Sequence, residues 1–353
     1  MTEHRHTVKA PPARRTGAFI AFVMAVLLAC GISIAGPDEG PEKQPERRTV
    51  DLTYAFVVQD LPKDAQDVSA WIPMPRNDDH QTLHGYSVET DHSATATKTD
   101  ELGNRYLRFD LSDAGDNDGA HARAAVTFTV TRTAYRALDG EDAETASDQE
   151  VARRYLSPNR LIPLGGSIAR EARRVAGQET GNVPRARRLY NHIVETMTYD
   201  KTGEGWGRGD AMYACSVRKG NCTDFHSLFI GEARALDIPA RFVMGLPLPP
   251  DKPAGKIDGY HCWAQFHAPG HSWIPLDASE ASKRPEVRDE RFGGLDANRV
   301  SFTIGRDITI PGTTAGPQNY VIYPHVEVDG SVWDDVSTTL QYRDVAPPAD
   351  AEE

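Results

Sequence analysis

Short runs of alternating apolar and polar residues fill the first part of the chain beyond residue 50. Each run is bounded by Asn, Asp, Gly or Pro, and a period of two is typical of a strand with one buried face. The runs cover residues 51–59, 68–72, 86–90, 106–111 and 124–133. Five such strands predict a β-sandwich-like domain over residues 50–136.

The apolar spacing becomes helical from Asp148 to Tyr199, with breaks at Pro158 and at residues 163–166. Val183–Met197 is the clearest helix, with Pro184 in its first turn. A second helix starts at Cys222 and is stopped by residues 237–239, and the first is expected to pack beside it. Two strand-like segments then follow, 260–267 and 273–277, and the turn between them predicts a hairpin.

These patterns divide the chain into consecutive segments. The expected units are a targeting segment (1–36), a linker (37–49), the β-rich domain (50–136), a catalytic domain (148–282), a β extension of that domain (283–345) and a disordered tail (346–353). The acidic tail and the Pro-rich linker follow from composition. The extension is expected to add strands to the sheet of the catalytic domain.

The N-terminal segment predicts export. A basic stretch over residues 4–15 precedes an uncharged, mostly apolar stretch over residues 17–35. Residues 27–31, Leu-Leu-Ala-Cys-Gly, resemble a bacterial lipoprotein box in which Cys30 would carry the lipid. Two alternatives stay open, cleavage after Ser33-Ile34-Ala35 and retention as a membrane anchor. Each places the folded part in the cell envelope, the periplasm or outside the cell.

The charge of the whole chain limits the classes of partner that are expected. The 353 residues carry a formal net charge of −12, and no basic run lies outside the N-terminus. A surface for nucleic acid needs clustered Lys and Arg, so nucleic acid is not expected as a partner. The expected partners are a peptide or protein substrate and, through the N-terminal segment, a membrane.

Cys222 is the residue that indicates chemistry. It follows a Gly-Asn turn and begins a helix, with Asn221 as a good N-cap and Asp224 placed for a capping box. The positive end of a helix lowers the pKa of a thiol, and its N–H groups can receive an oxyanion. This position therefore predicts a cysteine nucleophile.

His261 and Asp277 complete a triad in this prediction. His261 lies on the strand 260–267 as a general base, and Asp277 ends the paired strand, where its carboxylate would orient the imidazole. Because side chains alternate along a strand, His261 is expected to face the thiol and Cys262 to face away from it.

These motifs resemble those of the transglutaminase-like superfamily. The similar segments are Gly220–Phe225 with Ala235–Arg241, His261–Ala264, Trp273–Asp277, and upstream Tyr199-Asp200 and Trp206–Asp210. The resemblance implies an α+β, papain-like core, in which the helix bearing the cysteine packs on an antiparallel sheet. It also implies attack of a thiolate on a carboxamide or peptide carbonyl, with no cofactor and no metal, since no segment resembles the calcium-binding insertions of the large animal enzymes.

Other residues are weaker candidates. Trp206 and Asn221 are expected near the oxyanion or substrate cleft, with local packing as the alternative for Trp206. Cys215 and Cys262 would form a disulfide in an oxidising compartment, and two free thiols are the alternative. His226 is expected to support the site from the core, and its spacing from Cys222 fits no usual zinc pattern.

The sequence thus predicts an exported cysteine-dependent hydrolase of the peptidase or amidase kind. Transfer of the acyl group to an amine, as in a protein-glutamine acyltransferase, is the first alternative. A non-catalytic binding or scaffold module of the envelope is the second. The sequence does not separate hydrolysis from transfer, because both begin with the same thioester.

Overall fold

The structure is a computed structural model that describes residues 7–9, 46–113, 121–140, 150 and 152–348. Most of the expected targeting segment, including Cys30, lies outside these residues, as do the linker up to residue 45 and the end of the tail. No helix in the described part of the chain combines the length and apolar character needed to cross a bilayer.

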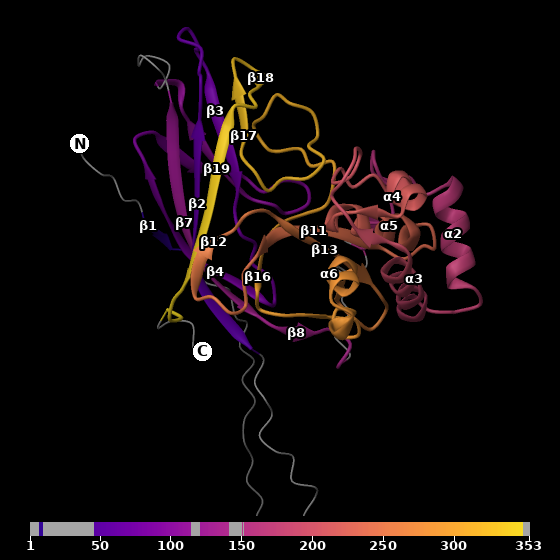
Figure 1. Cartoon of the computed structure of the whole chain (residues 1–353). Coiled ribbons are helices and arrows are strands. Elements are labelled where there is room, and N and C mark those ends of the chain that lie inside the picture. Colours follow the sequence, from indigo (N-terminus) through magenta and orange to yellow (C-terminus); the bar gives the residue numbers. More distant parts are fainter. Residues whose placement is uncertain (1–6, 10–45, 114–120, 141–149, 151, 349–353) are drawn as a thin grey trace, which may run out of the picture.

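Two antiparallel sheets form a β-sandwich (Figure 1). The first has the order β1 (Thr7–Lys9), β4 (Gln81–Thr90), β7 (Ala122–Thr133), β2 (Arg47–Val58), β19 (Val336–Asp344) and β12 (Ala254–Lys256). The second has the order β18 (Ser331–Val332), β17 (His325–Val328), β3 (Val68–Pro73), β6 (Tyr106–Asp110) and β5 (Ser93–Ala96).

The sandwich is held together by the alternation seen in the sequence. Every second residue of β2 from Val50 to Val58 is buried, so one face of the strand forms the core. Phe56 of the first sheet meets Phe109 of the second edge-on, with ring centroids 5.2 Å apart. The prediction of a β-sandwich-like N-terminal domain is confirmed, and its first long strand begins at Arg47, within the expected linker.

A third, smaller sheet forms the core of the region that carries the helices. Its order is β14 (Trp273–Leu276), β13 (His261–His267), β11 (Ala240–Pro247) and β16 (Arg299–Ile304), all antiparallel. The helices α2 (Gly166–Ala176), α3 (Asn182–Thr196), α4 (Ala211–Val217), α5 (Cys222–Arg234) and α6 (Ala278–Lys283) and the turn η2 (Pro285–Val287) accompany it. Short pairs join β9 (Thr198–Tyr199) to β10 (Lys219–Gly220), and β8 (Tyr135–Arg136) to β15 (Gly294–Leu295).

Helix α5 is the centre of this region. All of its residues are buried, because α2, α3 and α4 cover it on one side and β13 lies against it on the other. Figure 1 shows these helices gathered at the end of the molecule away from the sandwich. The helices predicted at 183–197 and from Cys222, their packing together, and the α+β class are all confirmed.

The C-terminal segment differs from the prediction. Only β16 joins the sheet of the core, whereas β17 pairs with β3, and β19 pairs with β2 along its whole length. The expectation that residues 283–345 extend the catalytic sheet is therefore wrong beyond β16. Alternation along a strand specifies a buried face but not a neighbour, and here the neighbours are strands of the sandwich.

Candidate active site

Cys222 is the first residue of α5, and the local sequence fixes it there. The Asn221 side chain accepts a hydrogen bond from Thr223 N–H at 2.9 Å, and Asp224 accepts one from Asn221 N–H at 2.9 Å. These two bonds form the predicted capping box. The thiol lies in a covered position, since Cys222 is 2% exposed.

Asp224 also ties the preceding loop to the start of α5. Its carboxylate accepts hydrogen bonds from Gly207 N–H at 2.7 Å and from Gly209 N–H at 3.0 Å. Gly220 approaches the same carboxylate with a φ of +153°, and an added Cβ would lie 2.2 Å from an Asp224 oxygen. The turn before Cys222 therefore requires glycine at this position.

His261 and Asp277 come together through the β13–β14 hairpin, which pairs as predicted from His267 opposite Trp273 to Ala264 opposite Leu276. His261 lies beyond the last of these pairs, and its Nε2 is 2.6 Å from Oδ2 of the fully buried Asp277. Asp277 does more than end a strand, because its other oxygen accepts Glu280 N–H at 2.9 Å and caps α6.

The ionisation of the three groups follows from these contacts. The Cys262 thiol and the His261 side chain both interact with the Cys222 thiol and hold its pKa well below the usual value, despite its burial. Burial alone would lower the pKa of His261, but the Asp277 carboxylate and Cys222 raise it to about 9. Burial opposes the charge on Asp277, yet His261, His226 and Arg299 keep its pKa well below the usual range. At neutral pH the arrangement favours a thiolate beside an imidazolium.

Comparison with known proteins places this region in a family. Residues 169–278 match the model of the transglutaminase-like superfamily. This region is a transglutaminase-like domain. A relative from Haemophilus influenzae, described as an uncharacterized protein, is 27% identical, and the match covers 87% of this chain and 93% of that protein.

A solved structure from Cytophaga hutchinsonii, described as a "Putative Cysteine Protease", has a TM-score of 0.52 at 16% identity. The match covers 85% of this chain and 99% of that chain, so the likeness extends over the sandwich as well as the transglutaminase-like domain. At this identity it shows a shared fold.

Cys262 departs from the sequence prediction. It lies on the face of β13 that packs on α5, with its sulfur 3.7 Å from His226 Nδ1 and 3.9 Å from Thr223 Oγ1, and it interacts with the Cys222 thiol. The expectation that Cys262 faces away from the thiol is wrong. Strand alternation does place His261 and Cys262 on opposite faces. Because His261 stands beyond the end of the hairpin, it nevertheless reaches the same thiol.

The cysteines of the described residues are free thiols. Cys215, on α4, lies 3.6 Å from a carboxylate oxygen of Glu171 on α2, while Cys262 lies between β13 and α5. The alternative of a Cys215–Cys262 disulfide is therefore not what the structure shows. The two side chains occupy different sides of the helical layer, and export alone does not bring thiols within bonding distance.

His226 supports the transglutaminase-like domain from within the core. Burial lowers its pKa to about 4, so the ring is neutral at neutral pH. Its Nε2 accepts the backbone N–H of Ala278 at 3.1 Å, which leaves the proton on Nδ1, the atom facing Cys262. The ring thereby links α5 to the residue directly after Asp277.

The two residues expected at the oxyanion cleft are engaged elsewhere. The Trp206 indole N–H donates to Gly203 O at 3.0 Å, and the Asn221 amide donates to Tyr260 Oη at 3.0 Å. Their roles in a cleft stay predictions. Among the described residues, the Cys222 N–H has no hydrogen-bond partner, so the N-terminus of α5 retains one donor beside the thiol.

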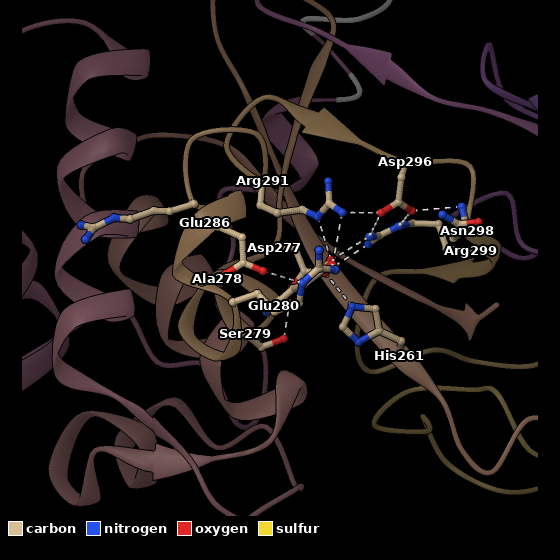
Figure 2. A network of polar contacts seen from close by, with 12 residues as sticks. His261, Asp277, Ala278, Ser279, Glu280, Glu286, Arg291, Asp296, Asn298 and Arg299 are labelled. Atoms are coloured by element: carbon tan, nitrogen blue, oxygen red, sulfur yellow. Dashed lines mark hydrogen bonds and ion pairs between the residues drawn. The ribbon is translucent and has the colours of Figure 1, made fainter. Parts of the chain in front are cut away.

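Arg299 is an important residue that sequence reasoning missed. It is 3% exposed and donates to Asp277 at 3.1 Å, to Glu280 at 3.0 Å and to Asp296 at 3.2 Å. Arg291 donates to Glu280 at 2.8 Å and also contacts Asp296, and Figure 2 shows the guanidinium groups and carboxylates converging behind His261. The only sequence signal is a single charged residue at the start of a strand whose other residues are uncharged.

This network also bears on metal binding. Ligand atoms of His261, Asp277 and Glu280 lie within 4.8 Å of one another, which is close enough for one ion. Both carboxylates, however, already receive hydrogen bonds from Arg299, whose positive charge takes the place that a cation would fill. The donor set therefore fits a metal poorly, and the absence of a metal requirement stays a prediction.

A groove of about 820 Å³ opens on the His261 side of the transglutaminase-like domain. Its walls come from β9, from the segments at 247–250 and 256–261, and from α6 and the residues after it. His261 and Tyr260 line this groove, so a ligand held there lies next to the imidazole.

Proposed function

We propose that the protein is a cysteine-dependent hydrolase that cleaves a carboxamide or peptide bond through a thioester on Cys222. The observation that carries the proposal is the chain of contacts from Arg299 through Asp277 and His261 to the Cys222 thiol. Each group holds the next in the protonation state that the chemistry needs. A vestigial scaffold has no reason to keep the pKa values of thiol and imidazole so far displaced.

In the proposed reaction the Cys222 thiolate adds to the carbonyl carbon, and the carbonyl oxygen becomes an oxyanion. The free Cys222 N–H and the positive end of α5 stabilise that charge. The His261 imidazolium then gives its proton to the leaving amine as the C–N bond breaks, which leaves the acyl group on sulfur. Water, deprotonated by neutral His261, attacks the thioester and restores the thiolate and the imidazolium.

Transfer to an amine is the second candidate. It differs only in the last step, where a primary amine replaces water. The groove beside His261 admits a second reactant of that size, and the family of the domain includes acyltransferases. Both outcomes share the same acyl-enzyme, so one experiment separates them.

The test uses a mixture of synthetic peptides of defined sequence incubated with the purified protein and quenched in acid. Mass spectrometry is expected to find an acyl adduct on Cys222 that hydroxylamine removes, as a thioester requires. Cys222→Ala should abolish the adduct, and His261→Gln should reduce it strongly. An adduct that persists in Cys222→Ala would move the chemistry elsewhere. Adding a primary amine separates transfer, which gives an amide product, from hydrolysis, which gives only the acid.

We further propose that the protein works in the cell envelope, held by a lipid on Cys30. The support is the basic and apolar pattern of residues 4–35 and the Leu-Leu-Ala-Cys-Gly sequence. Cells grown with a labelled fatty acid should yield a labelled protein that begins at Cys30, and Cys30→Ala should lose the label. Label that survives this substitution would contradict the lipid anchor, and removal of residues 1–35 without a lipid would favour a cleaved signal.

A further inference from the structure

The groove beside His261 is lined by more basic than acidic side chains, although the whole chain has a negative net charge. Its walls carry six basic side chains and four acidic ones, on a protein whose formal net charge is −12. The basic members are Lys201, Lys256, Lys283, Arg284, Arg291 and Arg299, and the acidic ones are Asp258, Glu280, Glu290 and Asp296. The imidazolium of His261 adds to the positive side. A groove lined by more basic than acidic side chains attracts anionic groups, even on a protein with a negative net charge.

The arginines do not account for this attraction, because their charges are already paired. Arg291 and Arg299 are bound to Glu280 and Asp296, and Arg284 pairs with Glu280 and Glu286. In the part of the chain that the structure describes, the three lysines of the groove have no carboxylate partner. They are the groups available to a ligand.

Two of these lysines share one aromatic ring beside the nucleophile. The Lys283 Nζ lies 4.4 Å from the centre of the Tyr199 ring, and the Lys201 Nζ lies 5.9 Å from it. Tyr199 pairs with Gly220 across the β9–β10 bridge, only two residues before Cys222. Two ammonium groups at one ring repel each other, and a carboxylate placed between them would turn that repulsion into attraction.

We propose that Lys201 and Lys283 form a carboxylate-binding subsite, and that the substrate is an acidic peptide with a carboxylate near the bond that Cys222 attacks. This inference rests on the proposed function of Cys222. The carboxylate lies over Tyr199 at the end of α6, and the rest of the peptide runs along the groove past His261. Recognition by exposed lysines contributes modestly to affinity, but it selects acidic peptides over their amides.

The test uses two peptidyl chloromethyl ketones that differ only in a glutamate or a glutamine next to the reactive group. Sulfur displaces chloride, so the rate of alkylation at Cys222, followed by intact-protein mass spectrometry, reports how well each peptide is placed. The glutamate probe is expected to react about fivefold faster at low salt, as one or two exposed ion pairs allow. Raising the salt concentration should remove that advantage and leave the glutamine probe unaffected.

Lysine variants test whether Lys201 and Lys283 cause the difference between the two rates. In the double variant Lys201→Met, Lys283→Met the ratio of the two rates should fall to about one, while Lys252→Met, an exposed lysine outside the groove wall, should keep the ratio of the parent protein. Equal rates for both probes at Cys222 of the parent protein, or an unchanged ratio in the double variant, would overturn the subsite and leave the nucleophile standing. Failure of both probes to label Cys222 would instead overturn the proposed function.

Discussion

The Cys222 thiol has two neighbours from one strand, and they act on it in different ways. His261 supplies a positive charge and receives the proton, whereas the Cys262 thiol supplies a hydrogen-bond donor without a charge. Burial and the nearby thiolate hold the pKa of Cys262 well above its usual value, so it stays protonated and able to donate. The neutral thiol therefore acts as a permanent donor to the proposed nucleophile.

This arrangement predicts an effect of Cys262 on reactivity. Cys262→Ala removes the donor and should raise the pKa of Cys222, so that alkylation by iodoacetamide at neutral pH becomes slower. Cys262→Ser keeps a donor of similar size and should stay closer to the parent protein. The measurement is the pH dependence of alkylation at Cys222, resolved by peptide mapping. Identical profiles for the alanine variant and the parent would contradict the role of the second thiol.

The pKa of His261 predicts the pH dependence of turnover. In the proposed reaction the imidazolium protonates the leaving amine, and its pKa is raised to about 9. With an amide substrate, kcat/KM should therefore fall about tenfold per pH unit above that value, because the acid form is lost. An activated ester has a leaving group that needs no proton, so its acylation rate should not show this fall. A loss of amide activity beginning near pH 7 would disagree with the pKa of His261.

At the scale of elements, the turn before α5 is held by one carboxylate. Asp224 accepts three backbone N–H groups, two of them from the loop at 207–209, so the same side chain starts the helix and fixes the loop over it. Burial raises the pKa of Asp224, and these three bonds oppose the rise. The position of the Cys222 thiol therefore depends on the turn at Gly220 and Asn221 keeping this backbone conformation.

Gly220→Ala should break the turn. The added Cβ meets Asp224 at 2.2 Å, and the backbone has a φ of +153°, which side chains rarely adopt. We expect a loss of about 3 kcal/mol in the free energy of unfolding, and slower alkylation of Cys222. Gly316→Ala is the matched control, since nothing lies within 4 Å of its added Cβ. Urea denaturation followed by circular dichroism measures both variants, and equal stability would show that the turn tolerates a side chain.

The elements that the sequence predicts correctly are those determined by residues close together in the chain. The capping box, the helix at Cys222 and the β13–β14 hairpin depend on neighbouring residues, and their signals lie within a few positions. The roles of Arg299 and Cys262 depend on contacts with helices that lie far from them in sequence. A single charge at the start of an otherwise uncharged strand is typical of an exposed end, and only the folded structure brings Asp277 and Glu280 to it. Alternation along β13 predicted that Cys262 faces away from the thiol, and the contacts of Cys262 with α5 show that it does not.

At the scale of the whole molecule, the sandwich and the transglutaminase-like domain share a sheet. The strand β12, which lies between the cysteine and the histidine in sequence, pairs with β19 at the edge of the first sandwich sheet. On the next strand, β2, Arg48 donates to Pro249 O at 3.0 Å, to Lys252 O at 2.8 Å and to Asn298 at 2.7 Å. Pro249 and Asn298 also line the groove, so a residue of the sandwich holds a groove wall in place.

Arg48→Ala should therefore weaken the joint between the two parts of the protein. The guanidinium is almost covered, and its loss leaves the Pro249 carbonyl group and Asn298 without their donor and removes the ion pair with Asp344. This should cost about 3 kcal/mol in the free energy of unfolding. Arg47→Ala is the matched control, because the neighbouring Arg47 is exposed and its side chain has no partner in the described part of the chain; its effect should stay below about 0.5 kcal/mol.

Urea denaturation followed by tryptophan fluorescence and by circular dichroism tests the joint. The parent protein is expected to unfold in one transition by both probes, because strands of the two parts form a continuous sheet. In Arg48→Ala the unfolding transitions measured by the two probes should no longer coincide, because the sandwich and the core lose the contacts of Arg48 that join them. Alkylation of Cys222 by a peptidyl chloromethyl ketone should also become slower, because the groove wall becomes more mobile. Coincident transitions at the stability of the parent would show that β12–β19 pairing alone couples the groove to the sandwich.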